Sequence, residues 1–198
     1  MVRFCELTLV TLATLAASAV STLGGCRSPE PEGATPSVPR STTEAAATER
    51  GEKLEVLIGA SSGSELRGTA TLTEVEEGGV RVIVDVAGVP PGKHGVHIHE
   101  KGDCSAPDAT SAGEHFNPEG HPHALPTTDP RHVGDLGNIE VRDDGTGHLD
   151  AVAPRASLRP GDARSFRGRS IIVHAKPDDG SQPSGAAGAR IGCGEIRG

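Results

Sequence analysis

The segment HGVHIHEKGDC, residues 94–104, carries three histidines and a cysteine within one short stretch. His97 and His99 are two residues apart, and in a β-strand residues i and i+2 project from the same face. Two imidazoles side by side can supply two ligands of a metal site, because neutral imidazole is a common ligand of transition metals. An isolated H-x-H pair also occurs at ordinary protein surfaces, so a metal site needs further donors from elsewhere in the chain.

Further donors follow in the segment between residues 101 and 136, which is rich in His, Pro, Asp and Gly. This segment contains His115, His121, His123 and His132. Loops of this length are uncommon in a compact domain unless they carry function. Several histidines together with acidic residues of the same loop favour a metal ion that orders it. A second long irregular segment covers residues 176–188.

The elements that must position these residues are short and rich in β-branched side chains, and Gly-Gly, Pro-Gly and Asp-Gly turns separate them. Strands are expected within residues 53–60, 66–75, 79–88, 94–100, 137–153, 170–175 and 189–196. The turns at 76–79 and 143–145 are typical of hairpins. We therefore expect an all-β domain, an antiparallel Greek-key β-sandwich or barrel of about eight strands with two long functional loops.

The N-terminal residues 1–25 are typical of a secretory signal peptide. Their ending, Leu23-Gly24-Gly25-Cys26, resembles a bacterial lipobox, after which the cysteine carries lipid; an ordinary signal peptide or an uncleaved anchor are the alternatives. Residues 26–50 hold four prolines and no large apolar cluster, so we expect a flexible tether. Residues 51–198 remain as a single folded domain, exported and lipid-anchored to a membrane, in the periplasm or at the cell surface.

The net charge narrows the classes of possible partner. A net charge of −8 argues against nucleic acid as a partner, and it would repel an anionic substrate unless positive charge is focused locally.

Of the four cysteines, Cys5 lies in the signal peptide and Cys26 at the lipobox. Cys104 and Cys193 remain as an even pair in a compartment where disulfides persist, and two free thiols are the disfavoured alternative.

The motifs together resemble the copper/zinc superoxide dismutase family, in the family's order from about Lys53 to Ile196. The segments that carry the resemblance are HIH (97–99), GEHFNPEGHPH (113–123), HVGD (132–135), VHAKPDD (173–179) and GARIGCG (188–194). The resemblance implies conversion of superoxide to oxygen and hydrogen peroxide by alternate reduction and oxidation of copper, with a structural zinc. The implied copper ligands are His97, His99, His115 and His174, and the implied zinc ligands are His115, His123, His132 and Asp135.

The resemblance also implies roles around the metals. His115 would bridge copper and zinc through its two ring nitrogens and pass a proton to the substrate. Asp178 would connect a copper ligand to a zinc ligand, with the adjacent Asp179 as its rival. Arg190 would attract the superoxide anion, so that the locally focused charge offsets the acidic net charge.

The histidines left over have other interpretations. His121 competes with His123 as a zinc ligand, and the eight-residue offset from His115 favours His123. His94 is expected to be exposed or structural, and His148 is expected at the surface or in packing.

Cys104 and Cys193 match the family's intrasubunit disulfide, which would pin the long loop to the strand that carries Arg190. The departures from the family pattern are mild. Glu114 replaces a small residue or proline before the bridging histidine, and Glu195 replaces an apolar residue. Neither change removes a ligand.

Two other functions are alternatives to this one. One is a non-catalytic envelope protein that binds copper and zinc; relatives that have lost activity usually lack a copper ligand, whereas every ligand position is filled here. The other is an adhesive β-sandwich lipoprotein with incidental histidines, which predicts no ordered spacing. Family members differ in their dimer surfaces, so a homodimer is left open.

Overall fold

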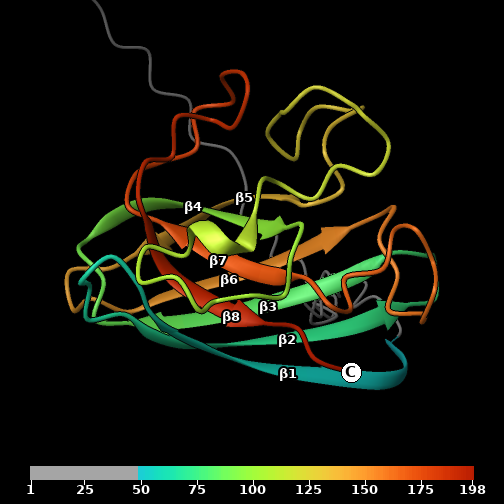
Figure 1. Ribbon diagram of the computed structural model, residues 1–198, viewed down its shortest axis with the longest axis horizontal. Coiled ribbons are helices and arrows are strands. Elements are labelled where there is room, and N and C mark those ends of the chain that lie inside the picture. The colour runs from blue at the N-terminus through green and yellow to red at the C-terminus, as the bar shows by residue number, and fades with distance from the viewer. Residues whose placement is uncertain (1–48) are drawn as a thin grey trace, which may run out of the picture. The chain divides into compact units, whose positions relative to one another are not determined.

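The computed structural model describes residues 49–198, which form a closed antiparallel barrel (Figure 1). Its strands are β1 (Glu49–Ala60), β2 (Arg67–Val75), β3 (Val80–Ala87), β4 (Gly92–His99), β5 (Asp135–Val141), β6 (Gly147–Ala153), β7 (Ser170–His174) and β8 (Arg190–Glu195). Around the barrel they follow the order β1-β2-β3-β6-β5-β4-β7-β8. The all-β expectation is confirmed, and closure, which removes free sheet edges, selects the barrel over the sandwich. The expected signal peptide, Cys26 and all but the end of the tether lie outside the described residues.

Connections between neighbouring strands, together with two crossing connections, β3 to β4 and β6 to β7, set this order. The turn between β2 and β3 closes where the Val75 N–H donates to the Gly79 carbonyl at 3.2 Å, and the turn between β5 and β6 closes between Arg142 and Thr146 at 2.9 Å. Gly79 has φ +100°, and a Cβ there would lie 2.5 Å from the Ala153 carbonyl oxygen, so this turn requires glycine. After β3 the chain crosses to β4, which pairs with β5 and β7 rather than with β3.

The barrel interior is filled mainly by valine, leucine and isoleucine side chains. Along β3, residues Val80, Val82, Val84 and Val86 are buried, and the residues between them are partly or fully exposed. Each buried side chain of this size contributes roughly 1.5–3 kcal/mol relative to an exposed one. Phe116 and Phe166 close one part of the core, with ring centroids 6.1 Å apart in a T-shaped arrangement.

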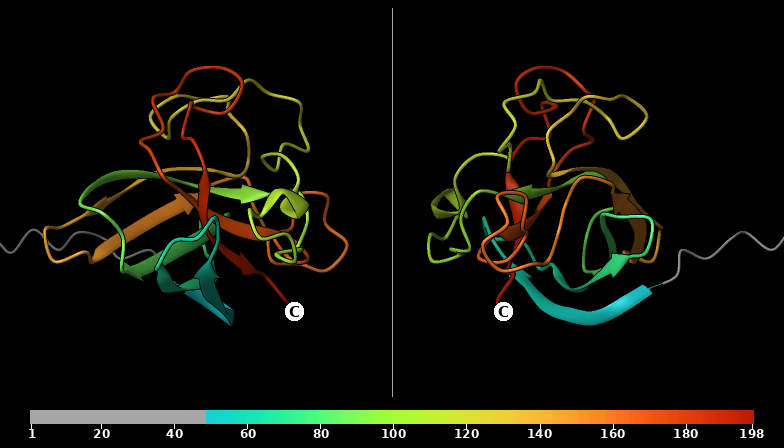
Figure 2. Two further views of the ribbon diagram at one scale, coloured as in Figure 1. Left: turned by 60° about the vertical axis from the view of Figure 1, so that its left-hand side comes forward. Right: turned by 90° about the vertical axis from the view of Figure 1, so that its right-hand side faces the viewer.

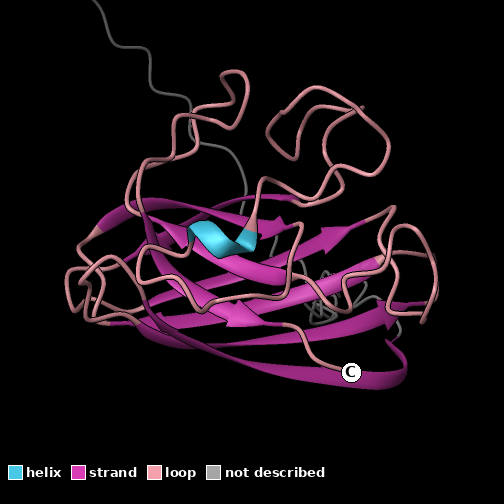
Figure 3. Ribbon diagram, in the orientation of Figure 1, coloured by secondary structure: helices cyan, strands magenta, loops and turns pink. Residues whose placement is uncertain are grey.

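Three long connections lie outside the strand ladder. The first and second are residues 100–134 and 175–189; in both views of Figure 2 the yellow part of the first, from about residue 115 onward, lies on the same side of the barrel as the second. The first contains a single turn of 3-10 helix, η1 (Thr110–Ala112), the one helical element of the described chain in Figure 3. The third connection, residues 154–169, was not expected as a long loop. No helix among residues 49–198 is long and apolar enough to cross a membrane.

Strand β4 is buried on both of its faces. Val96 and Ile98 point into the barrel core, and neither is exposed. His97 and His99 project from the opposite face, beneath the two loops, and are equally buried. Alternation along one strand therefore separates the hydrophobic core from a buried polar layer.

Candidate metal centre

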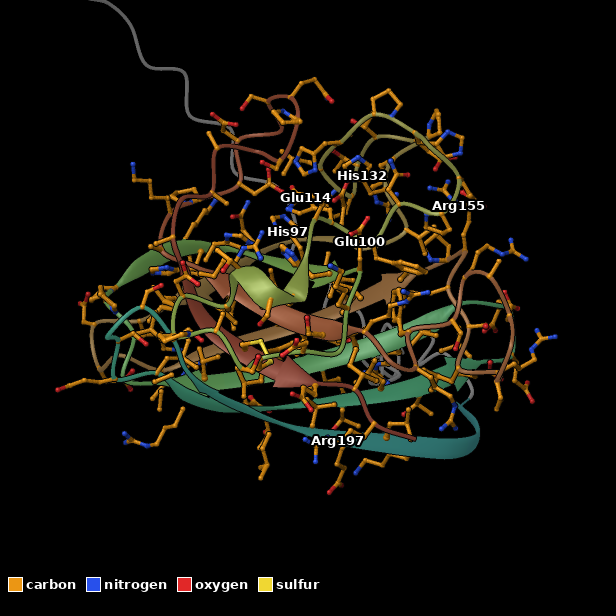
Figure 4. The ribbon with its side chains drawn as sticks, in the orientation of Figure 1. His97, Glu100, Glu114, His132, Arg155 and Arg197 are labelled. Atoms are coloured by element: carbon orange, nitrogen blue, oxygen red, sulfur yellow. A yellow bond between two sulfur atoms is a disulfide. The ribbon has the colours of Figure 1, made fainter. Side chains whose placement is uncertain are left out.

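The expected copper ligands converge on one point. His97 and His99 come from β4, His174 ends the neighbouring β7, and His115 is held beside His99 by an isolated β-bridge. The His115 ring centroid lies 4.0 Å from that of His97 and 5.0 Å from that of His99, and the His97 and His174 centroids are 4.9 Å apart. One nitrogen from each ring lies within 4.8 Å of those of the others. Figure 4 shows His97 between the barrel and the loops above it.

Each of three rings in this group uses one nitrogen for a hydrogen bond and leaves the other free. The His99 Nδ1–H donates to the Gly113 carbonyl at 2.9 Å, and the His174 Nδ1–H donates to the Gly188 carbonyl at 3.1 Å. The free nitrogens, His97 Nδ1, His99 Nε2 and His174 Nε2, are buried without a hydrogen-bond partner. Such groups cost about 1–3 kcal/mol each when left unpaired. Convergent, unpaired imidazole nitrogens fit a copper ion.

The expected zinc ligands form a second, adjacent group around one carboxylate. Asp135 Oδ1 lies 3.1 Å from His115 Nδ1 and 3.2 Å from His132 Nδ1, and Asp135 Oδ2 lies 3.0 Å from His123 Nδ1. Bonds of about 2.0–2.1 Å in tetrahedral geometry place ligand atoms roughly 3.3 Å apart. The Nδ1 atoms of His123 and His132 make no hydrogen bond despite these short distances. The set therefore fits a closed zinc site.

Asp178 connects the two groups. Its Oδ2 accepts from His97 Nε2 at 2.9 Å, and its Oδ1 accepts from His123 Nε2 at 2.9 Å. Asn138, which the motifs did not single out, pairs with the Asp178 backbone at 2.7 and 2.9 Å. Asp179 is exposed, and its carboxylate accepts from the Ser181 N–H instead. The structure thus places Asp178, rather than Asp179, between the rings.

The three strand-borne histidines are kept neutral. Burial lowers the pKa of His97 to about 4, that of His99 to about 2 and that of His174 to about 3. The positive charge of Arg190 lowers the pKa values of His99 and His174 further. A neutral imidazole is the form that binds a metal.

The zinc side has the opposite electrostatics. Burial lowers the pKa of His123, but the carboxylates of Asp135 and Asp178 outweigh it and raise that pKa to about 9. Burial raises the pKa of both carboxyls, yet their hydrogen bonds to histidine hold these pKa values well below the usual range. Negative charge is therefore concentrated where the loop histidines meet, and a divalent cation would offset it.

Arg190 is held at the edge of the copper side. It begins β8 opposite His174, and its Nη1 donates to the Ala109 carbonyl at 2.8 Å. The Cys104–Cys193 disulfide, with a Cα–Cα distance of 5.8 Å, ties the segment before Ala109 to the same strand. This expected bridge is confirmed. It spans 89 residues, for which the chain-entropy model gives about 4–5 kcal/mol of stabilisation.

His94 is buried at 4% exposure and lies outside both groups. One ring nitrogen lies 2.8 Å from the His174 carbonyl oxygen and the other 2.9 Å from the Pro90 carbonyl oxygen. Of the two expected roles, the structure selects the structural one. Its ring supports the backbone of a candidate copper ligand.

Three further residues lie apart from the metal groups. His121 is partly exposed and pairs with Glu119 at 3.3 Å, so the structure brings His123 rather than His121 to the zinc group. His148 is exposed and pairs with Asp85 at 2.7 Å. Glu114, labelled in Figure 4, directly precedes His115, and its side chain is exposed.

Residues 66–196 match the family model described as copper/zinc superoxide dismutase. A curated relative, the Superoxide dismutase [Cu-Zn] of Caulobacter vibrioides, is 41% identical over 136 residues, which cover 66% of this chain and 78% of that protein.

Solved structures show the same fold. A double mutant of a SOD-like protein from Bacillus subtilis, with a tyrosine and a proline each replaced by histidine, superposes with a TM-score of 0.65 at 36% identity, covering 73% of this chain and 97% of that one. The clock protein EA4 gives 0.64 at 36% identity, covering 76% and 99%. A SOD-like protein from Bacillus subtilis gives 0.64 at 34% identity, covering 72% and 97%.

Proposed function

This chain belongs to the copper/zinc superoxide dismutase family, and from that premise we propose how its own residues carry out the reaction. The enzyme converts two superoxide ions and two protons into oxygen and hydrogen peroxide, with copper and zinc as cofactors. The observation that carries the site assignment is the convergence of buried histidine nitrogens without hydrogen-bond partners.

We assign copper to the strand-borne group and zinc to the loop-borne group. The copper group is His97, His99, His115 and His174, and the zinc group is His115, His123, His132 and Asp135. An all-imidazole set suits copper, and three imidazoles with one carboxylate suit a closed zinc site. Copper, when bound, supplies the one-electron acceptor and donor that the reaction alternates between, and zinc supplies a fixed positive charge.

His115 is the residue shared by both groups, and we assign it the proton transfer. Its Nδ1 faces Asp135 on the zinc side, which leaves Nε2 for the copper side. A proton held at Nε2 is therefore positioned for the substrate, while Nδ1 keeps the ring in place. A fixed donor of this kind contributes through general acid catalysis.

Arg190 is proposed to guide superoxide to the site. The chain carries a net charge of −8, which repels an anion at long range. Arg190 is partly exposed, and its guanidinium is close enough to lower the pKa values of His99 and His174. Its anchor on the Ala109 carbonyl keeps this charge at the copper side rather than in solvent.

We also propose that the chain is exported and attached to a membrane by lipid at Cys26, in the periplasm or at the cell surface. The lipobox-like ending of residues 1–25 supports this, and so does the Cys104–Cys193 bridge, because disulfides persist in oxidising compartments. Mass spectrometry of the protein purified from the cell would detect the lipid on Cys26. The sequence leaves a homodimer open, and analytical ultracentrifugation would determine the oligomeric state.

The site assignment is tested on the full chain loaded with copper and zinc. Superoxide decay is followed by pulse radiolysis, and metal content is measured on the same sample. His99→Ala is expected to lower the rate at least 100-fold and to release copper, because it removes one of four converging nitrogens. His148→Ala, the same change at an exposed histidine outside the site, is the matched control and is expected to leave the rate within two-fold.

The alternative function, a non-catalytic copper- and zinc-binding envelope protein, gives a different result in the same experiment. Both metals would bind in stoichiometric amounts. After removal of free copper, superoxide would decay no faster with the protein than without it. That outcome would reject the proposed catalytic roles while leaving the ligand assignment intact.

A further inference from the structure

Residues 115–135 carry the candidate zinc ligands and are called the zinc loop below. One arginine outside the metal centre contacts this loop through ion pairs and hydrogen bonds. Arg155 lies in the connection between β6 and β7, and Figure 4 shows it beside that loop. Its Nε forms an ion pair with the Glu119 carboxylate at 2.9 Å but makes no hydrogen bond. Its Nη1 donates to the Asp129 carboxylate, and its Nη2 donates to the Arg131 carbonyl.

These three partners belong to different limbs of the zinc loop. Glu119 follows His115 on the outgoing limb, and Asp129 and Arg131 precede His132 on the returning limb. A single guanidinium therefore fastens the two limbs to each other. The planar fork of arginine can reach several acceptors at once, which the point charge of lysine cannot.

The contact with Arg131 acts next to a candidate ligand. The carbonyl that Arg155 binds belongs to the residue directly before His132. The side chain of Arg131 is itself buried, and it donates to the carbonyls of Thr128 at 3.3 Å and Asp135 at 3.4 Å. Arg155 thus holds the turn that presents two of the four zinc donors.

The other end of this contact is anchored on the barrel. Ala156 is buried in the core, and the Leu158 N–H donates to the Glu74 carboxylate on β2 at 2.9 Å. Within the connection, Ser157 and Phe166 are joined by a backbone hydrogen bond of 3.0 Å. Arg155 therefore ties a loop that lacks a strand ladder to a part of the molecule that has one.

An ion pair between fully exposed side chains would not hold the loop in place, because such pairs contribute little free energy. The Arg155 side chain is 23% exposed and combines two carboxylates with a carbonyl, whereas the neighbouring Arg159 is 76% exposed and lies 3.8 Å from Glu74. The two arginines share one connection and one charge but differ in what they hold.

We infer that Arg155 is a positioning residue for zinc: it holds the zinc loop in its binding conformation before the metal arrives. The inference rests on the proposed zinc ligands. A loop ordered in advance loses less conformational freedom on binding, so affinity rises without any new ligand.

The test measures zinc affinity of the metal-stripped full chain by competition with a colorimetric chelator. Arg155→Ala is expected to weaken zinc binding roughly 10- to 100-fold, the usual effect of removing a residue that orients metal ligands. Arg155→Lys is expected to recover only part of this loss. Arg159→Ala, with the same charge change in the same connection, is expected to stay within two-fold of the unsubstituted chain.

Two further readouts separate positioning from general stability. Cobalt(II) placed in the zinc site reports ligand geometry by its visible absorption, and that spectrum is expected to change in Arg155→Ala alone. The thermal midpoint of the metal-stripped chain is expected to fall no further in Arg155→Ala than in Arg159→Ala. A weaker zinc affinity that merely follows a lower midpoint would overturn the inference.

The outcomes also distinguish this inference from the proposed function. If the unsubstituted chain takes up no zinc at this group, the ligand assignment and the inference fall together. If it binds zinc and Arg155→Ala binds it within two-fold, the ligand assignment stands and the positioning role is rejected.

Discussion

The two halves of the metal centre are held in place by different means. On the copper side, His97, His99 and His174 lie on paired strands, where backbone hydrogen bonds of the barrel set their positions. On the zinc side, His123 and His132 lie in a loop without a strand ladder. The loop histidines are positioned instead by side chains that reach them from other segments.

The pKa values of the histidines also differ between the two halves. Burial keeps the strand-borne rings neutral, whereas two carboxylates raise the pKa of His123. The barrel therefore presents a copper-side geometry that exists before the metal binds. The zinc side combines negative charge with a loop, so that its geometry depends on the cation and on contacts such as those of Asp178 and Arg155.

Removing one ligand from each half gives the largest expected effect. His174→Ala should lower copper affinity at least 100-fold and leave zinc affinity within about three-fold, because β7 keeps its ladder. His123→Ala should lower zinc affinity at least 100-fold and also increase hydrogen exchange across the zinc loop. Metal titration with hydrogen-exchange mass spectrometry measures both, and equal loosening of the loop in the two variants would contradict the comparison.

Cutting the link between the halves gives an intermediate effect. Asp178→Asn removes the charge that joins His97 to His123, and zinc affinity should fall roughly 10- to 100-fold. Copper affinity should fall less, because the strand still holds His97. Asp179→Asn, the same change at the exposed neighbour, is the control for chelator-competition titrations. A larger loss of copper than of zinc would reverse the proposed roles of strand and loop.

The effects of pH on the stability of the metal-stripped chain have opposite signs in the two halves. The lowered pKa values of His97, His99 and His174 give stability that is present above pH 6.5 and is lost as pH falls toward 4. The raised pKa of His123 gives stability that is present below pH 6.5 and is lost as pH rises through 9. Each histidine contributes at most about 1.4 kcal/mol per pH unit.

Urea unfolding between pH 5 and pH 9 measures the free energy of unfolding across the acid limb and the alkaline limb of this pH profile separately. His123→Gln should flatten the alkaline limb alone, and His174→Gln should reduce only the acid limb. Unchanged pH profiles in both variants would show that the two halves do not differ in protonation when the metals are absent.

Much of the fold could be predicted from local pattern. Alternating β-branched segments and the turns at 76–79 and 143–145 correspond to the observed strands and hairpins. Closure into a barrel and the pairing of β3 with β6 depend on contacts between distant segments, which local pattern does not encode. The expected strands leave residues 154–169 between them, but nothing singles this connection out as important, because it has neither a repeating pattern nor a cluster of metal-binding residue types.

By itself the sequence determined which residue types could bind metal, that His97 and His99 share a face, and that two cysteines remain for a bridge. These conclusions follow from strand periodicity and from motif spacing. Only the tertiary structure decided between His121 and His123, between Asp178 and Asp179, and gave Arg155 its contacts. In an irregular loop no period relates sequence position to direction, so the path of the folded backbone alone decides which side chain faces the site.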